Sequence, residues 1–154
     1  MAWEKFGEET LKKLEKQKAF EDATVEKLNP LYKSITNPII KLFIHRIILD
    51  TMKHSDTYQT LINMHRRVVV GEIDRNKMTQ ELTYHTQNES AMLDQAVEIS
   101  KSVKDESSRK VLERIVEDEK RHHKILQELF EIISKEGEEW NKYLYDMFTG
   151  AGIP

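Results

Sequence analysis

The stretch VEDEKRHHKILQEL, residues 116–129, places an acid and an imidazole on the apolar side of a helical pattern. Apolar residues such as Ile115 and Leu126 recur there at helical spacing, which predicts an amphipathic helix. Continuing this apolar row by steps of three and four reaches Glu119 and His122. A helix that turns these two groups toward a core predicts either an ion pair or a bound cation.

Four such amphipathic patterns follow one another along the chain, which predicts an all-α fold. The expected helices span about residues 3–28, 37–66, 74–104 and 105–137, and a short fifth segment covers 138–148. Asn37 ahead of Pro38 is the expected N-cap of the second helix, and Asp105 or Ser107 that of the fourth. Pro30 is expected to kink or end the first helix. Four helices of this length favour a four-helix bundle.

The composition agrees with one helical domain, residues 1–154, and excludes several kinds of site. Charged residues make up 33% of the chain and hydrophobic residues 38%, with five glycines and three prolines, a balance typical of long amphipathic helices. Because the chain has no cysteine, disulfides, cysteine zinc sites, iron–sulfur clusters and thiol nucleophiles are excluded. Any metal must be bound by histidine and carboxylate side chains.

Charge and hydropathy predict a cytoplasmic protein without nucleic-acid or membrane partners. The net charge is −3, and lysine and arginine alternate with glutamate instead of forming a basic patch. No apolar run reaches the ~18–20 residues that a membrane span needs. The N-terminal sequence is too charged for a signal peptide.

The sequence matches itself when it is shifted by 68 residues, so that the first two helices fall on the last two. Glu21 coincides with Glu89 under this shift, and the cap Asn37 coincides with Asp105. Further pairs are Arg46 and Arg114, Ile47 and Ile115, Asp50 and Asp118, His54 and His122, Gln59 and Gln127, and Leu61 and Leu129. The chain is therefore predicted to consist of two similar helical hairpins.

Each of the four apolar rows is interrupted by polar residues near its middle. These residues are Glu21 in the first helix, Thr51 and His54 in the second, His85 and Glu89 in the third, and Glu119 and His122 in the fourth. A buried carboxylate is costly unless it is paired, protonated or bound to a cation. Four helices that carry such groups at one level therefore predict a metal ion.

Simpler interpretations of the same residues stay open. Glu119 and His122 could form an ion pair only, and Lys18 and Asp22 could form a plain salt bridge beside Glu21. The histidines that could bond a neighbouring side chain instead of a metal are His54 and His85, and those expected to be solvated are His45, His65 and His123.

At these residues the sequence resembles the ferritin-like superfamily, and within it the rubrerythrin-like and small archaeal ferritin-like proteins. The resemblance is carried by NPIIKLFIHRIILDTMKH (37–54) and LERIVEDEKRHH (112–123), and it covers roughly residues 10–134. It implies a ferritin-like four-helix bundle with a crossover between the second and third helices. The metal ligands that it implies by position are Glu21, His54, Glu89, Glu119 and His122.

The sequence departs from the family pattern at Thr51, where the second helix of the family has a glutamate that bridges two metals. Asp50 lies about 100° round the helix from that position, so it cannot take the place of this glutamate. His85 is an additional imidazole one turn before Glu89. A single Fe, Zn or Mn ion is therefore an alternative to a di-iron site.

Two functions are compatible with these residues. The resemblance implies iron-dependent reduction of peroxide or dioxygen, as in rubrerythrin, with an external electron donor because no cysteine is present for a rubredoxin module. The alternative is a non-enzymatic helical bundle, a scaffold or interaction module with a degenerate or single structural metal site.

The crossover also bears on assembly. The crossover must span the length of the expected bundle, which is ~36 Å. Residues 66–76 reach ~35 Å when fully extended, which is barely enough. A tight connection favours the exchange of hairpins between two protomers, so a homodimer or higher homo-oligomer is expected.

Overall fold

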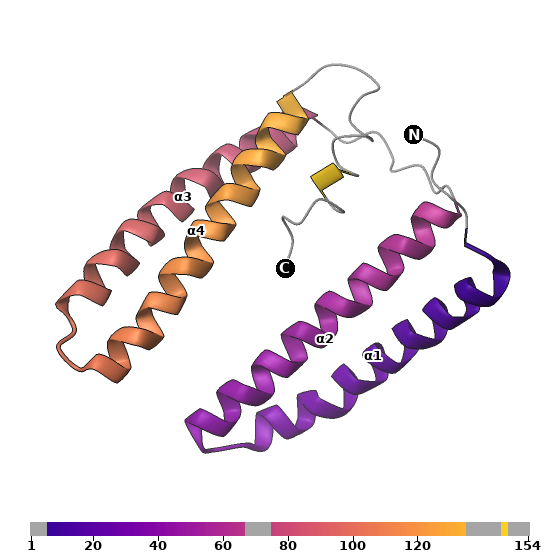
Figure 1. The fold of residues 1–154 in the computed structure, drawn as a ribbon, viewed down its shortest axis with the longest axis horizontal. Coiled ribbons are helices and arrows are strands. Elements are labelled where there is room, and N and C mark those ends of the chain that lie inside the picture. Colours follow the sequence, from indigo (N-terminus) through magenta and orange to yellow (C-terminus); the bar gives the residue numbers. More distant parts are fainter. Residues whose placement is uncertain (1–5, 67–74, 135–145, 148–154) are drawn as a thin grey trace. The chain divides into compact units, whose positions relative to one another are not determined.

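The computed structural model describes residues 6–66, 75–134 and 146–147, and the elements formed by these residues are four long helices, without a β-strand (Figure 1). In chain order the helices are α1 (Glu8–Ser34), α2 (Pro38–His65), α3 (Arg75–Ser102) and α4 (Glu106–Ser134). The predicted all-α class is confirmed. The predicted crossover falls largely on residues 67–74, outside the described residues, and so does the fifth segment except for Asp146 and Met147.

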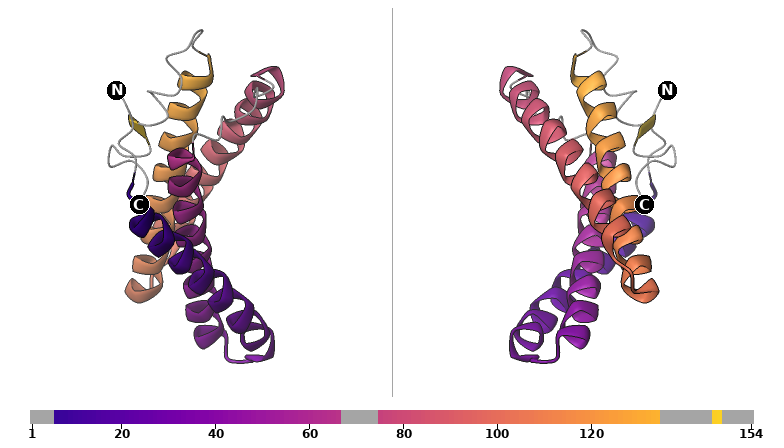
Figure 2. Two further views of the ribbon diagram at one scale, coloured as in Figure 1. Left: turned by 90° about the vertical axis from the view of Figure 1, so that its right-hand side faces the viewer. Right: turned by 90° about the vertical axis from the view of Figure 1, so that its left-hand side faces the viewer.

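The chain forms two compact units, Met1–Val70 and Gly71–Pro154, and each unit contains one helical hairpin. In the first unit α1 packs against α2, and in the second α3 packs against α4 (Figure 2). The links at residues 35–37 and 103–105 reverse the chain within three residues, so each pair is antiparallel. The two helical hairpins predicted from the sequence repeat are therefore confirmed.

The ends of the helices repeat at the same interval as the sequence. α1 ends at Ser34 and α3 at Ser102, while α2 begins at Pro38 and α4 at Glu106. Each of these two pairs is separated by 68 residues, the shift that aligns the sequence with itself. Equivalent positions in the two hairpins therefore occupy equivalent places on their helices.

N-cap side chains explain why α2 and α4 begin at equivalent positions. Oδ1 of Asn37 accepts hydrogen bonds from the backbone N–H groups two and three residues further on, at 3.0 and 3.1 Å. Oδ2 of Asp105 accepts a hydrogen bond from the N–H of Ser108 at 2.7 Å. All three bonds satisfy donors that have no partner within the helix. The cap of α4 is therefore Asp105, one of the two candidates.

Removing either cap is expected to destabilise its hairpin by a similar amount. Asn37→Ala and Asp105→Ala leave first-turn N–H groups without their acceptor, so we expect each to lower the free energy of unfolding by about 1 kcal/mol. In a chain of this size, that change lowers Tm by about 2–4 °C in circular-dichroism melting. Asn37→Asp keeps the acceptor and should melt near the wild-type temperature. A wild-type Tm for Asn37→Ala would contradict the capping role.

The first helix extends further than the sequence predicts. α1 continues through Pro30 to Ser34, so the prediction that it stops near residue 28 is wrong. Pro30 removes the N–H that would bond the carbonyl of Glu26, but both residues are exposed and water can satisfy that carbonyl. At its other end the helix begins at Glu8 rather than at residue 3.

The interior of each hairpin combines apolar layers with polar ones. Buried hydrophobic side chains in the described ranges are Ile48, Ile62, Val116 and Ile132, and buried polar ones are Thr51, Ser55 and Ser100. Large hydrophobic side chains are also exposed, many of them on α2. Even so, none of the helices as described has an apolar stretch long enough to cross a bilayer.

Candidate metal centre

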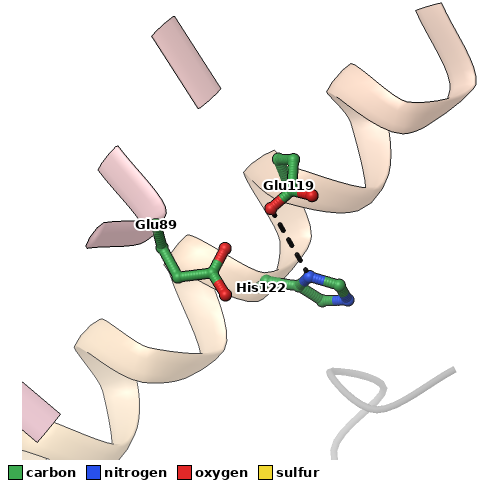
Figure 3. Close-up of side chains that lie close together, drawn as sticks. All are labelled: Glu89, Glu119 and His122. Atoms are coloured by element: carbon green, nitrogen blue, oxygen red, sulfur yellow. Dashed lines mark ion pairs between the residues drawn. The ribbon is translucent and has the colours of Figure 1, made fainter. Parts of the chain in front are cut away.

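Three side chains of the second hairpin converge at one level, Glu89 from α3 and Glu119 and His122 from α4 (Figure 3). One potential ligand atom of each residue lies within 4.8 Å of the other two. Glu119 and His122 share a side of α4 because they are three residues apart, and Nδ1 of His122 lies 3.7 Å from Oε2 of Glu119. Glu89 approaches from the other helix of the pair, so this group depends on the packing of α3 against α4.

The two carboxylates of this group are more enclosed than its imidazole. The Glu119 side chain is 14% exposed, whereas the His122 side chain is 50% exposed. Oε2 of Glu89 and Oε2 of Glu119 are both buried, and neither forms a hydrogen bond with any described residue. A buried carboxylate oxygen is unfavourable without a donor or a cation. This hairpin therefore has two interior acceptors that a cation or a shared proton would satisfy.

The proximity of the two carboxyl groups raises the pKa of Glu119. The main cause is that a protonated Glu119 can donate a hydrogen bond to the Glu89 carboxylate, which favours the protonated form. Burial and repulsion by the Glu89 charge act in the same direction, and His122 acts in the opposite one. In the metal-free protein, a proton shared by the carboxyl groups can therefore hold the position between them.

The residue types and spacing fit a single cation. Donor atoms bound at ~2.0–2.2 Å to one zinc or iron ion lie roughly 3.0–3.5 Å apart. Because the three donor atoms here lie within 4.8 Å of one another, side-chain movements of about 1 Å would bring them to one ion. Two carboxylates and one neutral imidazole balance the charge of a divalent ion, and these donors suit Fe²⁺, Mn²⁺ and Zn²⁺.

The first hairpin has a smaller polar group at the equivalent level. Oε1 of Glu21 lies 3.4 Å from Nδ1 of His54, so an acid on α1 meets an imidazole on α2. Thr51, one turn before His54, is buried at 6% exposure and offers a hydroxyl instead of a carboxylate. Among the described residues, the three-ligand group is therefore found in the second hairpin alone.

The salt bridge considered beside Glu21 is present. Nζ of Lys18 lies 2.6 Å from Oδ2 of Asp22, and the Ser55 hydroxyl donates to the other oxygen of that carboxylate. These two hydrogen bonds hold the pKa of Asp22 below its usual value, and the bond from Lys18 has the larger effect. Asp22 is thus paired with Lys18 and Ser55, while Glu21 is paired with His54.

His85, the additional imidazole in the predicted ligand set, lies outside the three-residue group. Its side chain is 57% exposed, and its Nε2 lies 3.7 Å from Oε2 of Glu81, one turn earlier on α3. Its ring also packs edge-on against the ring of Tyr84 at 5.7 Å between centroids. These contacts keep His85 with its own helix, and its role as a ligand stays a prediction.

The second hairpin also contains interior polar atoms that the sequence pattern missed. Nδ1 of His123 and Oγ1 of Thr86 are buried without a hydrogen-bond partner, so the prediction that His123 is solvated is wrong. From Glu119 the apolar row can continue by three residues or by four, and both steps are helical. In the structure the step of four leads to the interior, because Nδ1 of His123 is buried whereas the His122 side chain is half-exposed. The sequence does contain a signal for this burial, because Val116, Glu119 and His123 are spaced by three and then four residues, as on one side of a helix.

Two more histidines expected to be solvated are half-buried instead. The His45 ring lies 5.1 Å from the Tyr32 ring between centroids. Nδ1 of His65 accepts a hydrogen bond from the backbone N–H of Phe6 at 3.1 Å. Both histidines pack within the first hairpin, so their contacts are structural.

Comparison of the chain with models of known protein families, with curated proteins and with solved structures gave no match. The resemblance to the ferritin-like superfamily therefore rests on the residues of this chain alone.

Proposed function

We propose that the protein binds a divalent transition-metal ion through Glu89, Glu119 and His122, and that iron at this site supports a rubrerythrin-like reduction of peroxide or dioxygen. The observation that supports metal binding best is the pair of buried carboxylate oxygens beside an imidazole, neither of which forms a hydrogen bond among the described residues. Structural ion pairs of exposed residues leave no such oxygens, because water or a donor satisfies them.

The same three residues suit the proposed chemistry in different ways. Bound iron would supply the electrons that reduce peroxide or dioxygen. Glu89 and Glu119 supply the negative charge that holds the cation, and metal binding requires Glu119, whose pKa is raised, to be deprotonated. His122 is half-exposed, so a small substrate can approach from its side of the site. Electrons must come from a separate donor, because the chain has no cysteine.

The resemblance also assigns Glu21 and His54 to the metal site, and the sequence adds His85 as a further imidazole; these assignments stay predictions. We further propose that the helices form a four-helix bundle with a crossover, and that the protein is a cytoplasmic homo-oligomer. None of them is required for binding of one ion by the three residues of the second hairpin.

A structural ion is the second candidate function. It is favoured by the origin of the ligands, because Glu89 belongs to α3 and the other two to α4. An ion held by all three would cross-link the helices of one hairpin and stabilise it without any turnover. The protein would then be a metal-stabilised scaffold.

Metal titration followed by a turnover assay tests the proposal. We expect the purified, chelator-treated protein to bind about one equivalent of Zn²⁺ or anaerobic Fe²⁺ with a Kd of about 1 μM or tighter in calorimetry. The Fe²⁺-loaded protein should consume peroxide with a chemical reductant present, and the Zn²⁺-loaded protein, its redox-inactive control, should not. Binding without turnover would favour the structural ion. No binding of either metal at micromolar concentration would exclude both functions.

A further inference from the structure

The two hairpins are the same scaffold with one difference among the ligand positions. Glu21 is equivalent to Glu89, and His54 to His122, at the 68-residue interval that also relates the helix ends. At the third position, Glu119 of the second hairpin is equivalent to Thr51 of the first. We infer that Thr51 limits the chain to one strong cation site, and that the first hairpin is the same site with one carboxylate missing. This inference rests on the proposed function.

The remaining residues of the first hairpin already have the geometry of the second. Glu21 and His54 lie 3.4 Å apart, and their equivalents Glu89 and His122 each offer a ligand atom within 4.8 Å of the other. The exposure of the imidazoles is also similar, 56% for His54 and 50% for His122. An acid and an imidazole are therefore placed for a cation in both hairpins.

Thr51 lies where a third ligand is needed but cannot act as one of equal strength. It is 6% exposed, on the buried side of α2 and one turn before His54. Its hydroxyl is neutral and shorter in reach than a glutamate, so Glu21 alone opposes the charge of a divalent ion. The first hairpin therefore offers one negative charge where the second offers two.

Neighbouring acids do not replace the missing carboxylate. Asp22 is bonded to Lys18 through one carboxylate oxygen and to Ser55 through the other, so both of its oxygens already have a donor. Asp50 is exposed and lies 3.2 Å from Nζ of Lys53. Thr51 is thus the position at which a carboxylate would complete the group.

Zinc titration of Thr51→Glu tests the inference. The wild-type protein is expected to bind one equivalent strongly, and Thr51→Glu two, with the affinity of the first hairpin rising by at least about 100-fold. Thr51→Gln is the matched control, because it has the same size without the charge, and it should keep one strong equivalent. Adding His54→Ala to Thr51→Glu should also return the count to one, which would locate the second ion at the first hairpin.

The reverse change keeps the test decisive if Thr51→Glu does not fold. Glu119→Thr gives the second hairpin the residue of the first, and it should leave the chain with no strong equivalent while helix content is unchanged. A folded Thr51→Glu protein with one strong equivalent, or a strong site that survives Glu119→Thr, would overturn the inference. A wild-type protein without a strong site would instead overturn the proposed function, so the two failures are distinguishable.

Discussion

Glu119→Ala is expected to weaken zinc binding by at least about 100-fold. The substitution removes one of three ligands and half of the negative charge that opposes a divalent ion. Loss of a residue that only orients a ligand already costs about 10–100-fold in affinity, so loss of a ligand should cost more. Competition with a chelator of known affinity, at pH 7.5, measures the change. His122→Ala should have an effect in the same range, because the imidazole is the one nitrogen donor of the group.

The third helix offers a matched control for this variant. Glu81 and His85 are separated by 3.7 Å, the same distance as Glu119 and His122, but both are exposed, and among the described residues no second carboxylate joins them. Glu81→Ala should therefore leave zinc affinity within about twofold of the wild-type value. If Glu81→Ala and Glu119→Ala lowered the zinc affinity equally, the metal would not be bound specifically by the buried group of Glu89, Glu119 and His122. His85→Ala separately tests whether this predicted ligand contributes.

Glu119→Gln is expected to stabilise the metal-free protein at neutral pH. The pKa of Glu119 is raised in the folded state, so protonated Glu119 stabilises the fold. This contribution is fully present at pH values below the ordinary pKa of a carboxyl group, and it is lost as the pH rises through the raised pKa. Glutamine does not ionise, and its amide can donate to Glu89. We expect a gain of about 1–2 kcal/mol at pH 7.5, which raises Tm by about 2–8 °C. The gain should shrink as pH falls toward 4.

Glu117→Gln is the control for general charge effects on α4. Glu117 is exposed and lies 2.8 Å from Nζ of Lys120, so its neutralisation removes a surface ion pair worth little. Its Tm should stay within about 2 °C of wild type at both pH values. If Glu119→Gln melted at or below the wild-type temperature at pH 7.5, strain between the two carboxyl groups would not be a feature of this hairpin.

The helices and their repeat were predictable because their signals are local. Asn37 ahead of Pro38, for example, combines a capping side chain with a proline that suits the first turn. Pro30 shows the limit of such signals. Its effect depends on whether water reaches the carbonyl one turn earlier, and exposure is a property of the folded hairpin.

The candidate site was predictable in its residue types and less so in its geometry. Residue spacing placed Glu119 and His122 on one side of a helix, which the 3.7 Å distance confirms. It did not distinguish His122 from His123, because steps of three and of four are equally helical. The folded structure resolves this point, since Nδ1 of His123 is buried and His122 is half-exposed.

Local rules thus account for where the helices begin, why the halves match, and which position differs between them, Thr51 against Glu119. Contacts across the hairpin follow from another cause. Glu89 meets Glu119 because two helices pack at one particular rotation about their axes, and that rotation depends on side chains along their whole length. The same packing buries the two carboxylate oxygens together, and this burial turns a pair of ordinary glutamates into a candidate metal centre.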